Sequence, residues 1–354
     1  MLRNAPLLEL GRFAFDAKRA RFGNNVTYIV NRHVNPTNLC VYSCRFCDFA
    51  ARRGDSHAYS LAEDDILASL ADPGVQEVHL VGGLWPEWGL DRSLQLVRRI
   101  LDARPDLWIK AFTAVEVAYF ARAARRTTRD ILAFMIDAGV NQMPGGGAEV
   151  LSERLHQLLF KQKIGPEEWL RIHEEAHDLG LSSNCTLLFG HLETDEEIVE
   201  HLFRLRASQD RTGGFQSFIP LSYQPGETKL VPRLASAPRC LRVVALARLV
   251  LDNIPHIKAY WPTLQIETAA AALTFGADDL DGTLGAERIM HAAGSATPAQ
   301  LSTALMQEII LQAGQTPVQR TGCFAQPGRV RQSVPSIKSI KSIASSRPPL
   351  ACPT

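Results

Sequence analysis

Short runs rich in β-branched and aromatic residues alternate along this chain with longer amphipathic segments. The β-like runs cover residues 27–35, 76–81, 107–113, 139–143, 182–189, 215–221, 256–260 and 275–280. The helix-like segments cover residues 61–71, 92–104, 128–138, 166–179, 195–209, 239–252 and 298–313. Alternation of this kind is typical of parallel βα units. Eight such units in about 300 residues predict a TIM-like (βα)8 barrel rather than an open doubly wound sheet.

The barrel is expected to span residues 26–315, including its C-terminal helices. Residues 1–25 form an N-terminal extension, and residues 325–354 form a basic tail that is predicted to be disordered because it is rich in Pro and Ser. The whole chain is 46% hydrophobic and 21% charged, with a net charge of +1. This balance excludes a disordered chain and argues against nucleic-acid binding. No apolar run approaches the ~18 residues of a membrane helix, and no signal peptide is visible, so a cytoplasmic location is expected.

Several polar motifs come directly after the expected strands: CVYSCRFC, VGGLWP, FTAVE, PGGGAE and FGHLET. In a (βα)8 barrel the carboxyl ends of all strands meet on one face, where active sites are found. We therefore expect these motifs to lie together around one site.

Three of the seven cysteines fall within eight residues, as Cys40, Cys44 and Cys47. Thiolates are the usual ligands of iron–sulfur clusters, normally four per cluster. Three thiolates would leave one iron of a 4Fe–4S cluster open to a substrate. The alternatives are a structural zinc site, with His33 or His57 as the fourth ligand, and three buried free cysteines.

The CxxxCxxC spacing, with Phe46 before the last cysteine, resembles the signature of the radical S-adenosylmethionine (SAM) superfamily. The resemblance implies that Cys40, Cys44 and Cys47 hold a 4Fe–4S cluster whose open iron is chelated by SAM. It also implies that Phe46 packs near the adenine. The Gly82-Gly83 pair resembles the motif that hydrogen-bonds the methionine amino group of SAM, and glycine permits such a close backbone approach.

Longer strings between about residues 25 and 315 resemble the aminofutalosine synthase family of menaquinone biosynthesis. They are NRHVNPTNLCVYSCRFCDFA, WIKAFTAVE, MPGGGAEVL, LLFGHLET, QDRTGGFQSFIPL, LDNIPHIKAYW and FGADDLDGT. The resemblance implies a transferase that adds the 5′-deoxyadenosyl radical of SAM to 3-[(1-carboxyvinyl)oxy]benzoate. Rearrangement and decarboxylation then give 6-amino-6-deoxyfutalosine. One departure is Trp85, where the family usually has His.

The implied substrate carries two carboxylates, whose burial requires cationic or N–H partners. Candidates at the expected strand ends are Arg32, Lys110, Lys258, His33 and His191. We predict substrate binding by Arg32, Lys110, His191 and Lys258, and catalytic roles for His33, His191 and Glu149. Glu149 would also accept a hydrogen bond from the ribose or the amino group of SAM. Each of these residues has a structural alternative, as a salt-bridge partner or a helix-capping acid.

Two other functions compete with this interpretation. One is a hydrogen-abstracting relative of the dehypoxanthine futalosine cyclase or FO synthase type. The other is a non-catalytic iron–sulfur or zinc protein, which the ligand-like VGG and PGGGAE strings argue against. The expected partners are a small-molecule substrate and an electron donor such as flavodoxin or ferredoxin, with no nucleic acid and no membrane.

Overall fold

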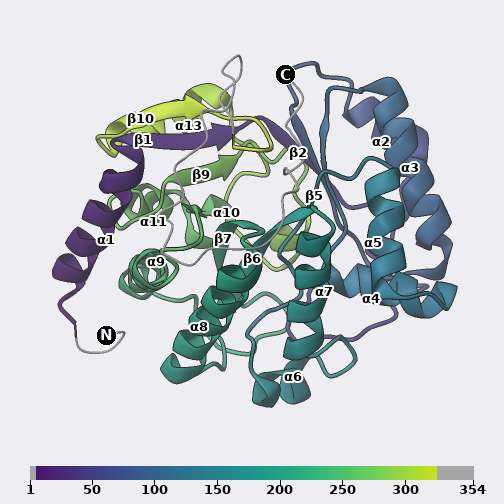
Figure 1. Cartoon of the computed structure of the whole chain (residues 1–354), viewed down its shortest axis with the longest axis horizontal. Helices are drawn as coiled ribbons and strands as arrows, with labels where there is room; N and C mark the ends of the chain where they lie inside the picture. Colours follow the sequence, from purple (N-terminus) through teal and green to yellow (C-terminus); the bar gives the residue numbers. More distant parts are fainter. Residues whose placement is uncertain (1–4, 325–354) are drawn as a thin grey trace, which may run out of the picture.

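A parallel sheet of seven strands forms the centre of the molecule (Figure 1). The computed structural model describes residues 5–324. The sheet follows the order of the chain: β2 (Asn31–Val34), β3 (Glu77–Leu80), β4 (Trp108–Lys110), β5 (Gln142–Met143), β6 (Ser182–Phe189), β7 (Phe215–Ser222) and β8 (His256–Ile257). Sequential parallel pairing of this kind is expected when each crossover carries a helix.

A second parallel sheet continues the first. It pairs β10 (Thr316–Gln319), β1 (Asn25–Ile29) and β9 (Asp279–Gly282). A single residue, Val30, separates β1 from β2, and a bridge between Lys258 and Asp279 joins the end of β8 to β9. The strands therefore curl around one axis. The expected TIM-like (βα)8 barrel, a radical SAM fold, is confirmed as this curled parallel sheet, whereas β10 was not predicted.

The helices lie mostly on the outside of the curled sheet (Figure 1). They are α1 (Leu7–Phe22), α2 (Glu63–Ser69), α3 (Leu90–Ala103), α4 (Ala114–Ala124), α5 (Thr128–Asp137), α6 (Glu153–Leu159), α7 (Pro166–Asp178), α8 (Asp195–Thr212), α9 (Ala237–Val250), α10 (Trp261–Leu264), α11 (Ile266–Ala272), α12 (Ile289–Ala292) and α13 (Thr303–Gln312), with a 3₁₀ turn at Pro86–Trp88. The N-terminal extension forms α1, which packs against α9 through Leu10, Ala14 and Ala245. The predicted tail, residues 325–354, lies outside the described residues.

Local capping signals explain where several helices begin. Thr194 starts α8, because its hydroxyl accepts a hydrogen bond from the Glu197 amide while the Glu197 carboxylate accepts one from the Thr194 amide. Thr113 forms the same reciprocal arrangement with Glu116 at the start of α4. The sequence did not predict α4, because the FTAVE string resembles a loop motif. The Thr-x-x-Glu spacing within it is the signal that predicts this helix.

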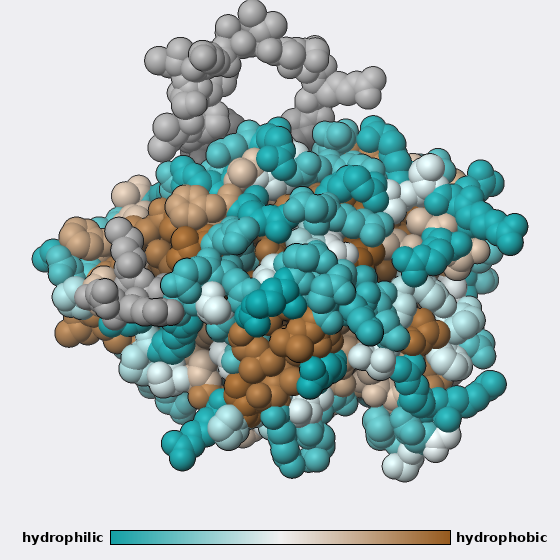
Figure 2. All heavy atoms as spheres, turned by 90° about the horizontal axis from the view of Figure 1, so that it is seen from below, coloured by the Kyte–Doolittle hydropathy of each residue, from teal (hydrophilic) through white to brown (hydrophobic). Residues whose placement is uncertain are grey.

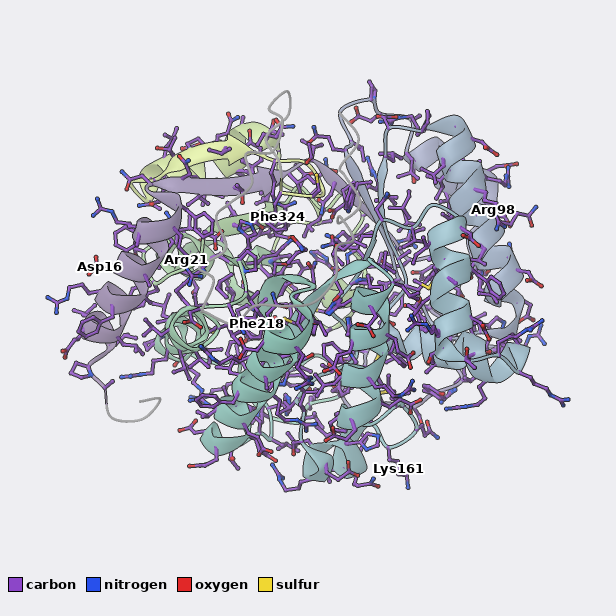
Figure 3. The ribbon with its side chains drawn as sticks, viewed as in Figure 1. Asp16, Arg21, Arg98, Lys161, Phe218 and Phe324 are labelled. Atoms are coloured by element: carbon purple, nitrogen blue, oxygen red, sulfur yellow. The ribbon has the colours of Figure 1, made fainter. Side chains whose placement is uncertain are left out.

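Alternation along β6 separates the core from the barrel interior. Cys185, Leu187 and Phe189 are fully buried, whereas Asn184 and Thr186 face a central cavity. Phe218 of β7 is likewise enclosed, while Asp16, Arg98 and Lys161 extend outward (Figure 3). Burial of one such aromatic side chain contributes about 1.5–3 kcal/mol to stability.

The outer surface is mostly polar. On the face shown in Figure 2, hydrophilic side chains predominate, and the apolar ones gather in several patches, of which the most extensive lies low in the centre of the view. Among residues 5–324, no helix combines the length and the apolar character that crossing a membrane requires.

Candidate active site

A cavity of about 310 Å³ opens at the carboxyl ends of the strands. Its wall takes side chains from β2, β3, β4, β6, β7 and β9 and from the loops that follow β5 and β8. This is the face on which the expected motifs were predicted to meet. We call the part of the cavity around Cys40, Cys44 and Cys47 the thiol end. The charged end is the part around Glu77, Lys110, Lys258 and Asp281.

All three clustered cysteines line the cavity and carry free, partly buried thiols. Burial raises the pKa of the Cys44 thiol to about 12, and burial also raises the pKa of Cys47. Thiolates at this place therefore require positive charge beside them, which iron ions supply. Within residues 5–324, no fourth cysteine lines this cavity. The donor set thus fits a 4Fe–4S cluster with one iron open to the cavity.

A single zinc ion fits this region less well. His57, one of the two histidines proposed as a fourth zinc ligand, is exposed on its loop and does not line the cavity. His33 does line the cavity. In the part of the chain that the structure describes, no three His, Cys, Asp or Glu side chains converge as a single-ion site.

The glycine pair after β3 supports the loop that carries the cysteines. The Gly83 amide donates a hydrogen bond to the Thr37 carbonyl at 2.8 Å. A Cβ atom on Gly83 would lie 2.1 Å from the Leu39 carbonyl oxygen, so no larger residue fits without moving this loop. Gly82 lines the cavity and Gly83 does not. The predicted contact with SAM therefore suits Gly82, whereas Gly83 holds the backbone next to Cys40.

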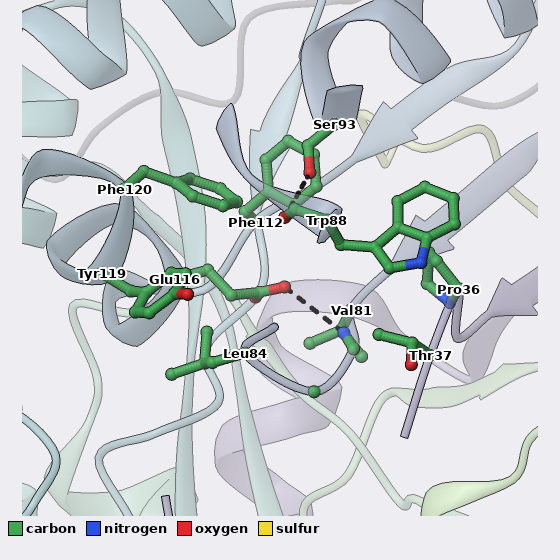
Figure 4. A pocket seen from close by; sticks show the side chains of 12 residues that line it. Pro36, Thr37, Val81, Leu84, Trp88, Ser93, Phe112, Glu116, Tyr119 and Phe120 are labelled. Atoms are coloured by element: carbon green, nitrogen blue, oxygen red, sulfur yellow. Dashed lines mark hydrogen bonds between the residues drawn. The ribbon is translucent and has the colours of Figure 1, made fainter. Parts of the chain in front are cut away.

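Glu116 fixes the glycine turn from the other side. Its Oε1 accepts a hydrogen bond from the Gly82 amide at 3.3 Å, and its Oε2 accepts from both the amide and the hydroxyl of Thr113 at 2.7 Å. Burial raises the pKa of Glu116 to about 7. The carboxyl lies beside a small pocket of about 20 Å³ that adjoins the main cavity (Figure 4). The sequence did not predict a role in the site for Glu116.

The PGGGAE loop closes another side of the cavity. A Cβ atom on Gly145 would lie 2.6 Å from the Cys185 Cα, so this loop packs directly on β6. Glu149 has a φ of 50°, an unfavourable conformation that its surroundings must enforce. Its Oε1 accepts a hydrogen bond from Lys163 Nζ at 2.5 Å, and that ammonium lies 5.1 Å from the ring centre of Phe46. Phe46, Glu149 and Lys163 thus share one wall, and the sequence analysis missed Lys163.

Buried ion pairs make up the charged end. Lys110 Nζ donates to Glu77 Oε1 at 2.8 Å. Lys258 pairs with Asp281, and its Nζ lies 3.7 Å from Asp279 Oδ1. Both lysines were predicted to bind substrate carboxylates, and both line the cavity. In the structure, each of these lysines already forms an ion pair with a carboxylate of the protein.

Two other predicted residues do not line the cavity. His191 accepts a hydrogen bond from the Leu192 amide through Nδ1 and contacts the Leu188 carbonyl oxygen through Nε2 at 3.1 Å, so both ring nitrogens engage the main chain of its own loop. The Arg32 guanidinium lies against Gly285. Neither position supports the roles predicted for these residues, which stay predictions. Trp85, the departure from the family pattern, also lies outside the cavity wall, where it precedes the 3₁₀ turn at Pro86–Trp88.

Comparisons with known proteins agree with this geometry. Residues 34–205 match the radical SAM superfamily, and residues 212–332 match the CofH/MqnC C-terminal region. An aminodeoxyfutalosine synthase of Thermus thermophilus is 41% identical over 334 residues, which cover 92% of this chain and 90% of that protein. Its counterpart in Streptomyces coelicolor is 36% identical, covering 88% of this chain and 84% of that protein.

Relatives with other printed activities are nearly as similar. A 5-amino-6-(D-ribitylamino)uracil–L-tyrosine 4-hydroxyphenyl transferase of Methanopyrus kandleri is 36% identical, covering 88% of this chain and 87% of that protein. Among solved structures, methylornithine synthase superposes with a TM-score of 0.71 at 17% identity, over 88% of this chain and 89% of that one, which supports the fold. The extent of these matches and the cysteine-lined cavity agree: the chain belongs to the radical SAM superfamily, in the branch that carries the CofH/MqnC C-terminal region and includes the aminodeoxyfutalosine synthases.

Proposed function

We propose that this protein is an aminodeoxyfutalosine synthase. It would join the 5′-deoxyadenosyl group of SAM to 3-[(1-carboxyvinyl)oxy]benzoate and release 6-amino-6-deoxyfutalosine after loss of one carboxylate. The 41% identity to the Thermus thermophilus enzyme over nearly the full length of both chains carries this proposal. Lys110 of the IKAFTAVE string, Lys258 of the IKAYW string and Asp281 of the DLDGT string line the charged end of the cavity.

The proposed cofactor is a 4Fe–4S cluster held by Cys40, Cys44 and Cys47, with SAM as co-substrate. A cluster bound there would supply, once reduced, the electron that cleaves SAM. The protein has to position the reactants and exclude water from a reactive intermediate. Phe46, Gly82 and Glu149 line the same cavity as the three thiols, so they are suited to hold SAM.

The charged end would receive the aromatic substrate. The strands β6 and β7 contribute apolar side chains to the cavity wall, such as Leu188 and Ile219, and these suit an aromatic ring. We further propose a cytoplasmic location and a small electron carrier of the flavodoxin or ferredoxin type as the reductant.

Anaerobic turnover tests the proposal. The reconstituted protein is mixed with SAM, dithionite and 3-[(1-carboxyvinyl)oxy]benzoate, and the products are analysed by mass spectrometry. We expect adenosine-derived carbon in a product with the mass of 6-amino-6-deoxyfutalosine. Free 5′-deoxyadenosine as the sole SAM-derived nucleoside would instead point to a hydrogen-abstracting relative. Intact SAM beside a reducible cluster would contradict any radical SAM activity.

Matched cysteine variants separate the cluster from general thiol effects. Cys44→Ala removes a thiol that lines the cavity. We expect this variant to bind less iron than the wild type and to form no product. Cys240→Ala changes a buried thiol on α9 that does not line the cavity. We expect this variant to retain both iron and product formation.

A further inference from the structure

Two histidines meet at the charged end. His33 of β2 and His79 of β3 both line the cavity, and the two strands pair directly at these residues. His33 Nε2 and His79 Nδ1 are 3.4 Å apart, and the rings contact edge to face with centroids 4.6 Å apart. One imidazole therefore donates to the other. His79 Nε2 is buried and has no hydrogen-bond partner. A buried polar atom without a partner points to a missing ligand or water.

Most charged groups around this histidine pair already have an oppositely charged partner, and Lys258 lies within ion-pair distance of both Asp281 and Asp279. The pairs are Glu77 with Lys110, Asp281 with Lys258, Asp279 with Arg320 and Glu287 with His291. They come from β3, β4, the segment after β8, β9, the loop after β9, α12 and the segment after β10. Hydrogen bonding to Glu287 raises the pKa of His291 to about 9, so this pair is also ionised at neutral pH.

Within residues 5–324, each lysine that lines the cavity already has an acidic partner, and no arginine lines it. Lys110 already pairs with Glu77 and Lys258 with Asp281, so each lysine would have to interact with the ligand and with its acidic partner at the same time. Burial of an unbalanced anion is costly. The two imidazoles are the remaining groups that line the cavity and can gain a positive charge. Burial lowers the pKa of both His33 and His79, so they are neutral before the ligand binds.

We propose that His33 and His79 together bind a carboxylate of the substrate and take up one proton from solvent as it binds. The proton adds to a ring nitrogen that carries none, so the pair becomes one imidazolium and one neutral imidazole, with an N–H that faces the carboxylate. Charge balance at this end of the cavity is then restored, and His79 Nε2 gains a partner. The two histidines then bind the substrate, whereas Lys110 and Lys258 pair with the carboxylates of the protein around it. The inference rests on the proposed function for the identity of the ligand.

Calorimetry measures the proposed proton uptake directly. The anaerobic holoenzyme is titrated with 3-[(1-carboxyvinyl)oxy]benzoate, without SAM, in phosphate and in Tris at pH 7.5. The apparent binding enthalpies in the two buffers differ in proportion to the number of protons exchanged. We expect an uptake of about one proton per bound ligand, and hence weaker binding at higher pH by linkage. Binding without proton uptake would overturn the inference.

Histidine variants locate the proton. We expect His79→Gln and His33→Gln each to abolish the uptake and to raise the KM for the aromatic substrate at least about tenfold, the loss of about 1.4 kcal/mol. The KM for SAM should not change. His57→Gln alters an exposed histidine outside the cavity and should leave every value unchanged. Proton uptake that survives in both cavity variants would contradict the assignment.

The wild-type protein supplies a second test that does not depend on how the variants fold. The KM for the aromatic substrate should rise with pH between 6 and 8.5, toward about tenfold per pH unit where one proton is required. A KM that does not depend on pH would overturn the inference. If the wild type forms product but shows no proton uptake, the inference fails and the proposed function stands. If it binds the ligand with proton uptake but forms no product, the proposed function fails and the binding site stands.

Discussion

The two ends of the cavity are built in different ways. The thiol end rests on backbone contacts between short motifs: the cysteine loop, the glycine pair at Gly82 and Gly83, and the capped start of α4 at Glu116. The charged end is an arrangement of buried side chains from strands that are far apart in sequence, such as Lys110 with Glu77 and Lys258 with Asp281.

This difference separates two physical strategies. Close backbone packing tolerates no added atom, so a single methyl group should disturb the thiol end. A buried charge depends on its oppositely charged partner, because an isolated buried charge is strongly unfavourable. We therefore expect the two ends to respond differently to mutation.

The largest effect is expected from an unpaired charge at the charged end. Lys110→Met leaves Glu77 buried at 1% side-chain exposure without its cation. We expect a loss of about 3–5 kcal/mol in the free energy of unfolding, measured by urea denaturation under anaerobic conditions. The double variant Glu77→Gln/Lys110→Met should recover most of this loss. Lys161→Met, at an exposed position, serves as the control. A loss as large in the double variant as in Lys110→Met would argue against the ion pair as the cause.

A smaller but localised effect is expected at the thiol end. Gly83→Ala places a methyl group against the Leu39 carbonyl and displaces the loop next to Cys40. A displacement of about 1 Å in an active site costs about 10²-fold in rate. We expect a loss of this size in product formation, together with a lower iron content after reconstitution. Gly89→Ala is the matched control, because Gly89 does not line the cavity and its added Cβ would lie 3.2 Å from its nearest contact, the Pro86 carbonyl oxygen. Full activity in Gly83→Ala would show that the loop is not held by this contact.

Glu116 should give a pH-dependent contribution to stability. Burial raises its pKa from 4.5 to about 7, so the folded state holds this proton more tightly than the unfolded state. Its contribution to the free energy of unfolding therefore falls as pH rises from about 4.5 to about 7, by on the order of 1–3 kcal/mol, and is constant above that range. Glu116→Gln removes this dependence. The difference in stability between the wild type and the variant, measured at pH 5 and pH 8, should thus change with pH. A constant difference would refute the assignment.

The smallest effect is expected at Trp85, where the chain departs from its family. This side chain is not part of the cavity wall. Substitution by His should change the free energy of unfolding by less than about 0.5 kcal/mol, as at ordinary surface positions. Steady-state kinetics should show the same KM values for SAM and the aromatic substrate. A changed KM for either would place Trp85 in contact with a bound ligand.

The sequence by itself determined the order of βα units, the cysteine loop and its glycine partner, because these features are encoded by local periodicity and by short motifs. Each of the eight β-like runs contains or adjoins a strand of the curled sheet. The helix α4 escaped prediction because its first turn coincides with a polar motif, and β10 because it pairs with β1 at the opposite end of the chain.

Only the tertiary structure decided which polar side chains face one another. Arg32 lies within β2 and His191 follows β6, yet neither lines the cavity. Side chains alternate between the two faces of a strand, so Asn31 and His33 face the cavity and Arg32 does not. The ring of His191 is bonded to the main chain of its own loop. The partner of each buried lysine, the contact between His33 and His79, and the place of Lys163 beside Phe46 are set by strands and loops that meet through folding. The partners in a buried charge network are distant in sequence. The sequence therefore shows which charged residues are present but not which of them contact one another.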